Sequence, residues 1–423
     1  MHDLHYQEPA SDATQALPVP PAQGRWREVA ISMFVGLGMV WYYQWLLLDL
    51  HIQTDVQGHV DYLLQVCSQG YPWPANPGFH WVTWLLAGQN CDGRLLHVGT
   101  WVLGLCWGGA AYLSMEVGQE FMQAESAPSR SLSPGAWADT TAAIAAAVAA
   151  CLVFPAPANT FVDNSFSHYL GLLSPNVYHN STLVGSMPFA IAALALGVRQ
   201  LRGHSRYGVD FLLGLVLASG ALFKPSFAFA FLPAYGICRL LYGRRALVRH
   251  LAGLLLVSVP VVLVIIGQTW WISKHPEVSI GGKSNFALAF PAGWKMFLPE
   301  LTAVQAFMLG MSSFALPLLA YGLRPSWLAK PAHQLALLST VFATIQFLLV
   351  YETGDRAGHG NFTWQVIATN HWLYWLVVLE TLHWQARTKS ERIRQVILVV
   401  AIAMSMASGI VYMGEIGLTG SYI

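Results

Sequence analysis

Charged residues are scarce in this sequence: Asp, Glu, Lys and Arg make up 10% of the 423 residues, whereas 55% are hydrophobic. A soluble globular domain usually carries about a quarter charged residues. This chain therefore has too little charge to build a water-facing surface, and we expect lipid to cover most of it. It also lacks a basic stripe or a known nucleic-acid-binding module, so nucleic acid is not expected as a partner.

Several familiar motifs are missing as well. There is no Walker A run, which argues against ATP-driven transport by this chain alone, and no H-E-x-x-H or G-x-S-x-G, which argues against common intramembrane hydrolases. None of the five cysteines has metal-ligand spacing. Cys67 and Cys91 share one polar segment, where they either form a disulfide in an oxidising compartment or stay free thiols.

What the chain has instead is a series of apolar runs. A spanning helix needs about 20 mostly apolar residues, and we predict an all-α polytopic integral membrane protein with about eleven transmembrane helices. The fifth and sixth runs are short and flank Lys224-Pro225, so they also fit a hairpin that reaches only part-way to the outer surface. The runs lie near 29–50, 95–115, 137–155, 182–199, 208–223, 226–242, 250–271, 301–322, 333–351, 370–386 and 395–413.

The basic residues predict the orientation of these spans. Of the 22 Lys and Arg residues, 16 fall in one set of alternate loops and 6 in the other, and the basic set is expected to be cytoplasmic. An odd number of spans then gives a cytoplasmic N-terminus and an outer C-terminus. We expect residues 1–26 to be an uncleaved polar tail and 27–423 a single membrane domain. Its longest outer loops fall near 51–94, 156–181, 272–300 and 352–369.

The first outer segment carries the first candidate site. Asp55 and His59 are four residues apart and share a face if the segment is helical. A carboxylate beside an imidazole is a usable base or cation ligand, although an ordinary solvated acid is the alternative. Asp61 and His80 follow in the same segment, and we include both as substrate-binding candidates. Aromatic residues mixed with Pro and His over 71–84 predict a re-entrant or interfacial stretch.

Two further candidates flank apolar runs. Lys224 is a lone cation on the side poor in basic residues, where burial in a membrane costs about 2.5–3.5 kcal/mol. Its natural partner is a phosphate or carboxylate, and a lysine that snorkels to the outer surface is the alternative. His179 directly precedes a run, so it either lines an outward pocket or merely accompanies a helix cap from Asn180 or Ser181.

The last outer loop gathers acid, base, imidazole and amide within ten residues. Glu352, Arg356, His359 and Asn361 are interleaved with three glycines. Glycines let a backbone approach a ligand closely, and an arginine can clamp a phosphate with two hydrogen bonds. The loop therefore predicts a substrate-binding segment.

An acid just after the first span, followed by a histidine and an aromatic interfacial stretch, resembles the C-type membrane glycosyltransferase superfamily (GT-C). The Lys224-Pro225-Ser226 junction and the loop over 352–364 are similar to segments of bacterial polysaccharide-assembly proteins. The resemblance implies a GT-C-like fold, a polyprenyl-phosphate-linked sugar donor, and a catalytic acid at Asp55. Asp55 and Asp61 are too far apart for a tight acidic pair, so no cofactor is certain and a divalent cation stays open.

The expected function is transfer of a sugar or oligosaccharide to an acceptor hydroxyl on the outer face of a bacterial inner membrane. Asp55 would act as base with the help of His59, and Lys224 and Arg356 would neutralise the leaving phosphate. Three alternatives stay open: a flippase of lipid-linked saccharide, a non-catalytic subunit of an envelope-assembly complex, and an acyltransferase. A flippase predicts ionisable residues near the midplane and related halves, and no internal repeat is visible.

Overall fold

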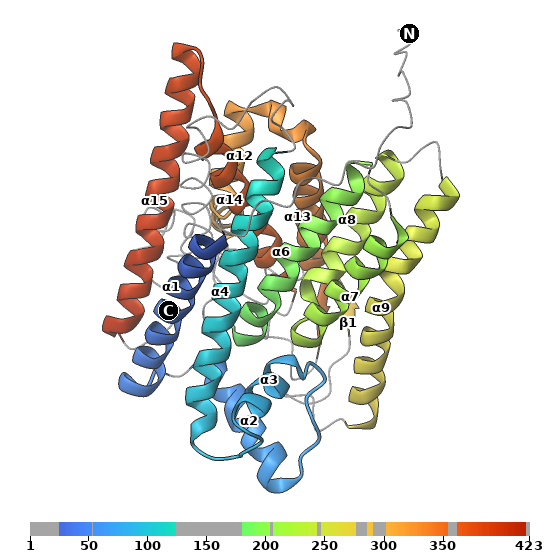
Figure 1. The fold of residues 1–423 in the computed structure, drawn as a ribbon, viewed down its shortest axis with the longest axis vertical. Coiled ribbons are helices and arrows are strands. Elements are labelled where there is room, and N and C mark those ends of the chain that lie inside the picture. The colour runs from blue at the N-terminus through green and yellow to red at the C-terminus, as the bar shows by residue number, and fades with distance from the viewer. Residues whose placement is uncertain are drawn as a thin grey trace.

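The computed structural model describes residues 25–52, 54–123, 180–203, 206–242, 247–275, 286–290, 302–353 and 362–419. These parts are almost entirely helical and pack as a bundle of mostly upright helices (Figure 1). The helices are α1 (Arg25–Gln44), α2 (Asp55–Gln69), α3 (Gly78–Leu86), α4 (Arg94–Gln123), α6 (Ser181–Leu201), α7 (Tyr207–Phe223), α8 (Ser226–Tyr242), α9 (Leu247–Lys274), α11 (Ala303–Ser312), α12 (Ala315–Leu323), α13 (Pro331–Leu349), α14 (Thr363–His383) and α15 (Lys389–Thr419).

Six of the described helices are long and apolar enough to cross a membrane, namely α1 with its following π-turn, α4, α6, α9, α13 and α15. Two more, α7 and α8, are apolar but have only 17 residues each, or about 25 Å of helix. These helices agree with the prediction of a helical membrane protein. The count of eleven spans and their orientation stay predictions, and the predicted span at 137–155 lies outside the described residues.

The outer helices expose apolar side chains in a way that suits lipid. Along α9, Leu255, Val259, Leu263, Ile266 and Trp270 are all exposed. In water such a continuous apolar face would be a site of aggregation or association. In a bilayer it is the expected surface, which explains how the chain manages with so few charged residues.

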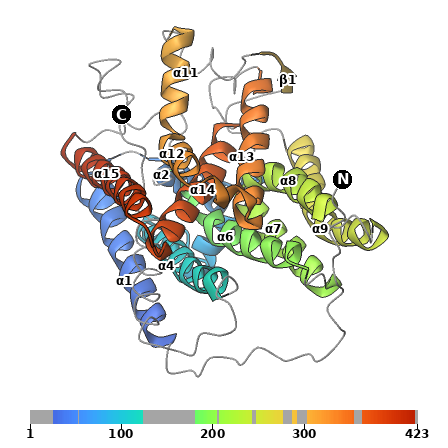
Figure 2. The same ribbon diagram turned by 90° about the horizontal axis from the view of Figure 1, so that it is seen from above.

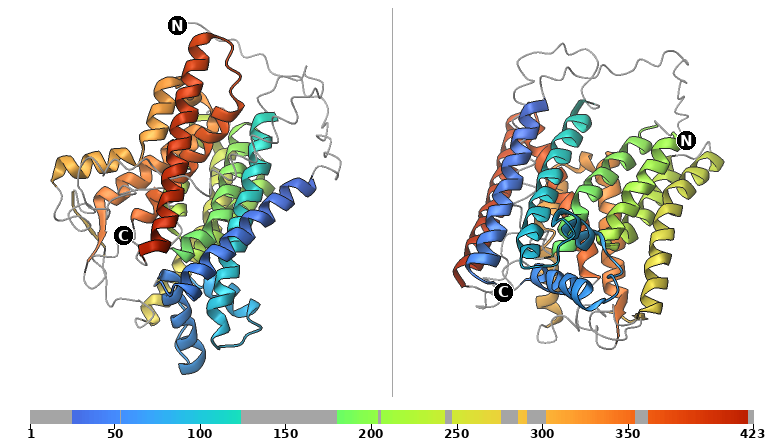
Figure 3. Two further views of the ribbon diagram at one scale, coloured as in Figure 1. Left: turned by 90° about the vertical axis from the view of Figure 1, so that its left-hand side faces the viewer. Right: turned by 60° about the horizontal axis from the view of Figure 1, so that its bottom comes forward.

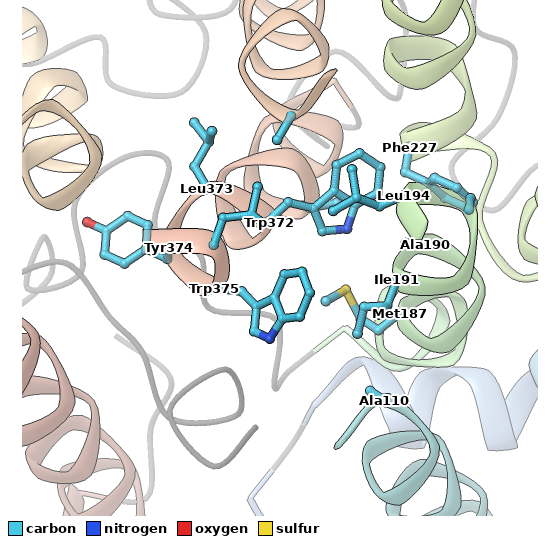
Figure 4. Close-up of a cluster of buried hydrophobic side chains, with 14 of the residues drawn as sticks. Ala110, Met187, Ala190, Ile191, Leu194, Phe227, Trp372, Leu373, Tyr374 and Trp375 are labelled. Carbon is cyan, nitrogen blue, oxygen red and sulfur yellow. The ribbon is translucent and has the colours of Figure 1, made fainter. Parts of the chain in front are cut away.

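The centre of the bundle is built around α14. Seen from above, α14 lies between α13 and α6, with α1 and α15 along one side and α8 and α9 along the other (Figure 2). Trp372 and Trp375 of α14 are almost fully buried and face α6 residues such as Met187 and Ile191 (Figure 4). Because α14 is covered by protein, it tolerates polar residues in its first half, and it begins at Thr363 rather than near 370 as the apolar run predicted.

The run predicted as one span at 301–322 is instead two helices, α11 and α12, that meet at Ser313. Pro317 explains the break, because a proline ring clashes with the carbonyl four residues earlier in a continuous helix. That carbonyl, on Ser313, accepts hydrogen bonds from Asn370 Nδ2 (2.7 Å) and from the Tyr374 hydroxyl (3.2 Å). Side chains of α14 therefore replace the helical hydrogen bond that Pro317 cannot donate.

One end of the bundle is capped by α2 and α3, which lie across the ends of α4 and α6 (Figures 1 and 3). Cys67 near the end of α2 and Cys91 before α4 form a disulfide with a Cα–Cα distance of 5.8 Å. Of the two alternatives for this pair, a disulfide or two free thiols, the structure has the disulfide. Trp271 Nε1 near the end of α9 donates to the carbonyl of Trp73 (2.7 Å). The disulfide thus ties α2 to the segment that leads into α4, and the hydrogen bond ties the layer to α9.

Candidate functional site

Asp55 is presented at the capped end by the first turn of α2. Thr54 is the N-cap: its hydroxyl accepts from the amide of Val56 (3.1 Å), and its own amide donates to Gln57 Oε1 (2.7 Å). This capping arrangement starts the helix at Asp55, where a carboxylate is favoured by the positive end of the helix dipole. The side chain of Asp55 is exposed, so the acid is both stabilised and accessible.

Lys224 reaches the same place from between α7 and α8. The residue before a proline is pushed out of the helical conformation, and Lys224, which precedes Pro225, is indeed extended with φ −157° and ψ 119°. Its side chain is 8% exposed and its ammonium lies 4.6 Å from the centre of the Trp364 ring. A cation held over an aromatic face is stabilised there by the ring.

Asn180 connects these two charged groups. Its Nδ2 donates to Asp55 Oδ2 (3.0 Å) and its Oδ1 accepts from Lys224 Nζ (3.0 Å). The same Oδ1 accepts from the backbone amide of Leu183 (2.9 Å), so Asn180 is also the N-cap of α6. Because Oδ1 faces only donors and Nδ2 faces a carboxylate, the amide has a single favourable orientation.

Phe223, the residue before Lys224, is enclosed by two glycines. A Cβ added at Gly78 of α3 would lie 2.7 Å from Phe223 Cδ2, and one added at Gly185 of α6 would come closer still to the same ring. Real Cβ atoms essentially never make such close contacts, so both positions must be glycine for the Phe223 ring to fit between them. The ring of Phe223 therefore docks the α7–α8 turn between α3 and α6 and places Lys224 beside Asn180.

His59 lies one helical turn after Asp55, as its spacing predicted. Its Nδ1 is 3.2 Å from Nε2 of His80 on α3, and the Phe79 ring meets it edge-on with ring centres 5.9 Å apart. Burial lowers the pKa of His59 to about 4; the charge of Asp55 opposes this shift and that of Lys224 adds to it. His59 is therefore neutral at physiological pH, and it lies close enough to Asp55 and Lys224 for both charges to affect its pKa.

The other predicted residues have four different outcomes. His80 is 1% exposed and lies behind His59. Its connection to the site is the contact between its Nε2 and Nδ1 of His59. Asp61 is exposed and follows His59 by two residues, which turns it to the opposite side of α2. Glu352 is buried at the end of β2 (Val350–Glu352), where it is in register with Phe286 of β1 (Phe286–Leu288). His179, Arg356, His359 and Asn361 lie outside the described residues.

The sequence did not single out Asn180 or Trp364 as site residues. Asn180 carries a signal, since an Asn just before an apolar run predicts an N-cap, and that interpretation is confirmed. Its second role depends on Asp55, which is 125 residues away, and Trp364 meets Lys224 only through the packing of α14 against α8. Nothing local in the sequence indicates either contact.

The arrangement brings a carboxylate, a neutral imidazole and a buried ammonium group to one end of a helical bundle. Such a set can remove a proton from a hydroxyl and neutralise a phosphate. Within the described parts of the chain, no group of three His, Cys, Asp or Glu side chains is placed to hold a metal ion. No family model matches the chain, and no curated protein matches its sequence.

Proposed function

We propose that this chain is a membrane glycosyltransferase that moves a sugar or oligosaccharide from a polyprenyl-phosphate-linked donor to an acceptor hydroxyl. The observation that carries the proposal is the connection from Asp55 through Asn180 to Lys224. It couples an accessible acid to a buried cation across three separate parts of the chain. The setting is cell-envelope or exopolysaccharide assembly, including polymerisation of lipid-linked repeats.

Each half of the site suits one half of the reaction. The Asp55 and His59 pair takes the proton of the acceptor hydroxyl, whose oxygen then bonds to the anomeric carbon of the donor. The bond from that carbon to the lipid phosphate breaks, and its electron pair leaves on the phosphate oxygen. The Lys224 ammonium offsets the negative charge that develops there, and it does so strongly because it is shielded from water.

The surroundings of the site suit a lipid-linked donor. Trp81, Leu85 and Leu86 of α3 are exposed apolar side chains in the layer that carries the site. Trp and Leu on a short surface helix are typical of segments that lie in the membrane interface. A donor anchored in the bilayer would then present its phosphate and sugar at the depth of Asp55 and Lys224.

The test is sugar transfer by the purified full-length protein in lipid vesicles, with a short-chain polyprenyl-phosphate sugar and a saccharide acceptor. Asp55→Asn and Lys224→Met should each lower kcat by about 10²-fold or more, while the protein still folds. The matched controls Asp92→Asn and Lys274→Met change exposed residues away from the site and should leave kcat unchanged. Normal turnover by Asp55→Asn would refute the proposed role of the acid.

A flippase of lipid-linked saccharide is the second candidate, and one observation favours it. Asp210 of α7 and Arg239 of α8 form a buried ion pair among apolar helices, and ionisable residues inside a membrane often mark a transport path. However, Gln200 Nε2 also donates to Asp210 Oδ1 (2.8 Å), so this acid is well satisfied. The same vesicles distinguish the candidates, because a flippase moves the intact donor between leaflets without forming a glycosidic bond.

A further inference from the structure

Helices α7 and α9 pack closely on the side that faces the bundle. A Cβ added at Gly214 of α7 would lie 2.7 Å from the carbonyl oxygen of Leu256 on α9. A Cβ added at Gly253 of α9 would overlap the side chains of Asp210 and Arg239. Both helices therefore need glycine on this inner side to pack as they do.

On the lipid-facing side of the same pair of helices lies a groove with a volume of about 580 Å³. It follows the first half of α9, and its lining side chains are apolar apart from one tyrosine hydroxyl. The side chains along its rim are about half exposed. The groove therefore suits a hydrocarbon chain that enters from the bilayer. Its lining includes Tyr207, Phe211, Ala252, Leu255 and Val259.

Hydrocarbon alone would not hold a particular lipid in this groove. Lipid tails are as apolar as the side chains that line it, so a chain gains little by moving from the bilayer into the groove. A preference for one lipid must come from its headgroup. The charges at the end of the groove therefore decide which lipid it binds.

The segments that meet at this end carry an excess of positive charge. Residues 199–210 and 239–252 contain seven arginines and one acid. That acid, Asp210, is buried in an ion pair with Arg239 and also accepts from Gln200 Nε2 (2.8 Å). A lipid with a negative headgroup is favoured beside such segments.

Two of these arginines lie at the end of the groove itself. Arg206 directly precedes Tyr207 on α7, and its side chain is exposed. Arg249 comes one turn before Ala252 on α9 and is exposed as well. The backbone of Arg206 is fixed by Gln200, whose Oε1 accepts from its amide (3.2 Å) and whose Nε2 donates to its carbonyl (2.9 Å). Arginine side chains can hold a phosphate through two parallel hydrogen bonds.

We propose that this groove is a binding site for an anionic phospholipid, with one acyl chain between α7 and α9 and the phosphate held by Arg206 and Arg249. The site is separate from the proposed site of sugar transfer. Arg206 and Lys224 flank the 17-residue helix α7 and are about 27 Å apart along it. A donor whose phosphate meets Lys224 therefore cannot place that phosphate at Arg206, and a phospholipid of the opposite leaflet can.

Native mass spectrometry of the full-length protein in detergent measures this binding. Titration with dioleoyl-phosphatidylglycerol, which is anionic, and dioleoyl-phosphatidylcholine, which is zwitterionic, gives a dissociation constant for each. We expect the anionic lipid to bind at least about tenfold more tightly to the wild-type protein. The double variant Arg206→Gln, Arg249→Gln should lose this preference. The matched control Arg387→Gln, Arg392→Gln changes two exposed arginines beside the start of α15 and should keep it.

A second variant tests the groove itself. Ala252→Phe places a ring where the acyl chain lies, so it should weaken the binding of both lipids alike. The control Ala403→Phe adds the same ring at an exposed position of α15, on the opposite side of the bundle (Figure 2), and should bind as wild type. Equal losses in the two arginine pairs would show only a general attraction of charge and would overturn the proposal. Unchanged binding by Ala252→Phe would overturn it too.

The wild-type protein alone provides a further measurement, which serves if a variant does not fold. A ligand that binds only the folded state stabilises it, so the midpoint of thermal unfolding should rise more with phosphatidylglycerol than with phosphatidylcholine. Equal shifts with the two lipids would contradict the site. None of these measurements depends on turnover, so absence of sugar transfer would contradict the proposed function alone.

Discussion

At the scale of single residues, the site depends on how burial and charge act on His59. Its pKa in the folded protein is about 4, below its ordinary value of 6.5. Between these two values the unfolded chain binds more protons than the folded one, so stability must fall as the pH is lowered from 6.5 toward 4. Above pH 6.5 this contribution is fully present and constant.

We therefore expect the midpoint of thermal unfolding in detergent to drop as the pH is lowered from 7 to 4.5, and to drop less in His59→Asn. The asparagine keeps a polar side chain but has no proton to gain in this range. His80, whose pKa is also lowered by burial, should contribute in the same direction, so His59→Asn removes only part of the slope. An unchanged pH dependence in both His59→Asn and His80→Gln would contradict the assignment.

At the scale of elements, the position of Lys224 depends on the close packing around Phe223. Gly185→Leu would place a side chain where the Phe223 ring lies, so the α7–α8 turn must move and the Lys224 contact with Asn180 must lengthen. We expect sugar transfer to fall at least about tenfold, with a destabilisation of about 1–3 kcal/mol typical of overpacking.

The matched control is Gly267→Leu. Gly267 is a helical glycine of α9 with nothing near its would-be Cβ, so this change should leave both transfer and the unfolding midpoint close to wild type. If Gly185→Leu transferred sugar normally, the packing of Phe223 would not be what positions Lys224. Both variants replace a helical glycine by leucine, so a difference in transfer or stability between them cannot come from helix propensity. It must come from the packing around the new side chain.

The elements also show what the sequence could and could not predict. The start of α2 has a local signal that the sequence analysis did not use, because Thr54-Asp55-Val56-Gln57 has the pattern of a capping box. The break at Lys224-Pro225 was expected from the proline. The pairing of His59 with His80, 21 residues away, depends on how α3 folds back. The break at Ser313 was missed because apolar residues continue on both sides of it and outweighed the local signal of Pro317. The hydrogen bonds from α14 that satisfy the Ser313 carbonyl could not be predicted from the local sequence.

At the scale of the whole molecule, the charges divide the bundle into two unlike ends. One end carries the α2–α3 layer (Figure 1). The disulfide lies in this layer, and Lys224 lies beside it through its hydrogen bond to Asn180. Asp210 and Arg239 lie roughly 20 Å away along the helices, near the other ends of α7 and α8. Disulfides persist in oxidising compartments, and basic residues favour the cytoplasm, so both signals predict the same orientation, with the site on the outer side.

This sidedness predicts a labelling pattern in intact cells. After treatment with a membrane-impermeant reductant, Cys67 and Cys91 should react with an impermeant maleimide, in a background where the three other cysteines are serine. Ser390→Cys, at an exposed position beside the basic residues that begin α15, should react only in inverted vesicles or after permeabilisation. Labelling of both positions from the same side would contradict the orientation. Labelling of Cys67 and Cys91 only from the inner side would place the proposed site on the face where an outer-leaflet donor cannot reach it, so this one experiment tests the geometry on which the proposed reaction depends.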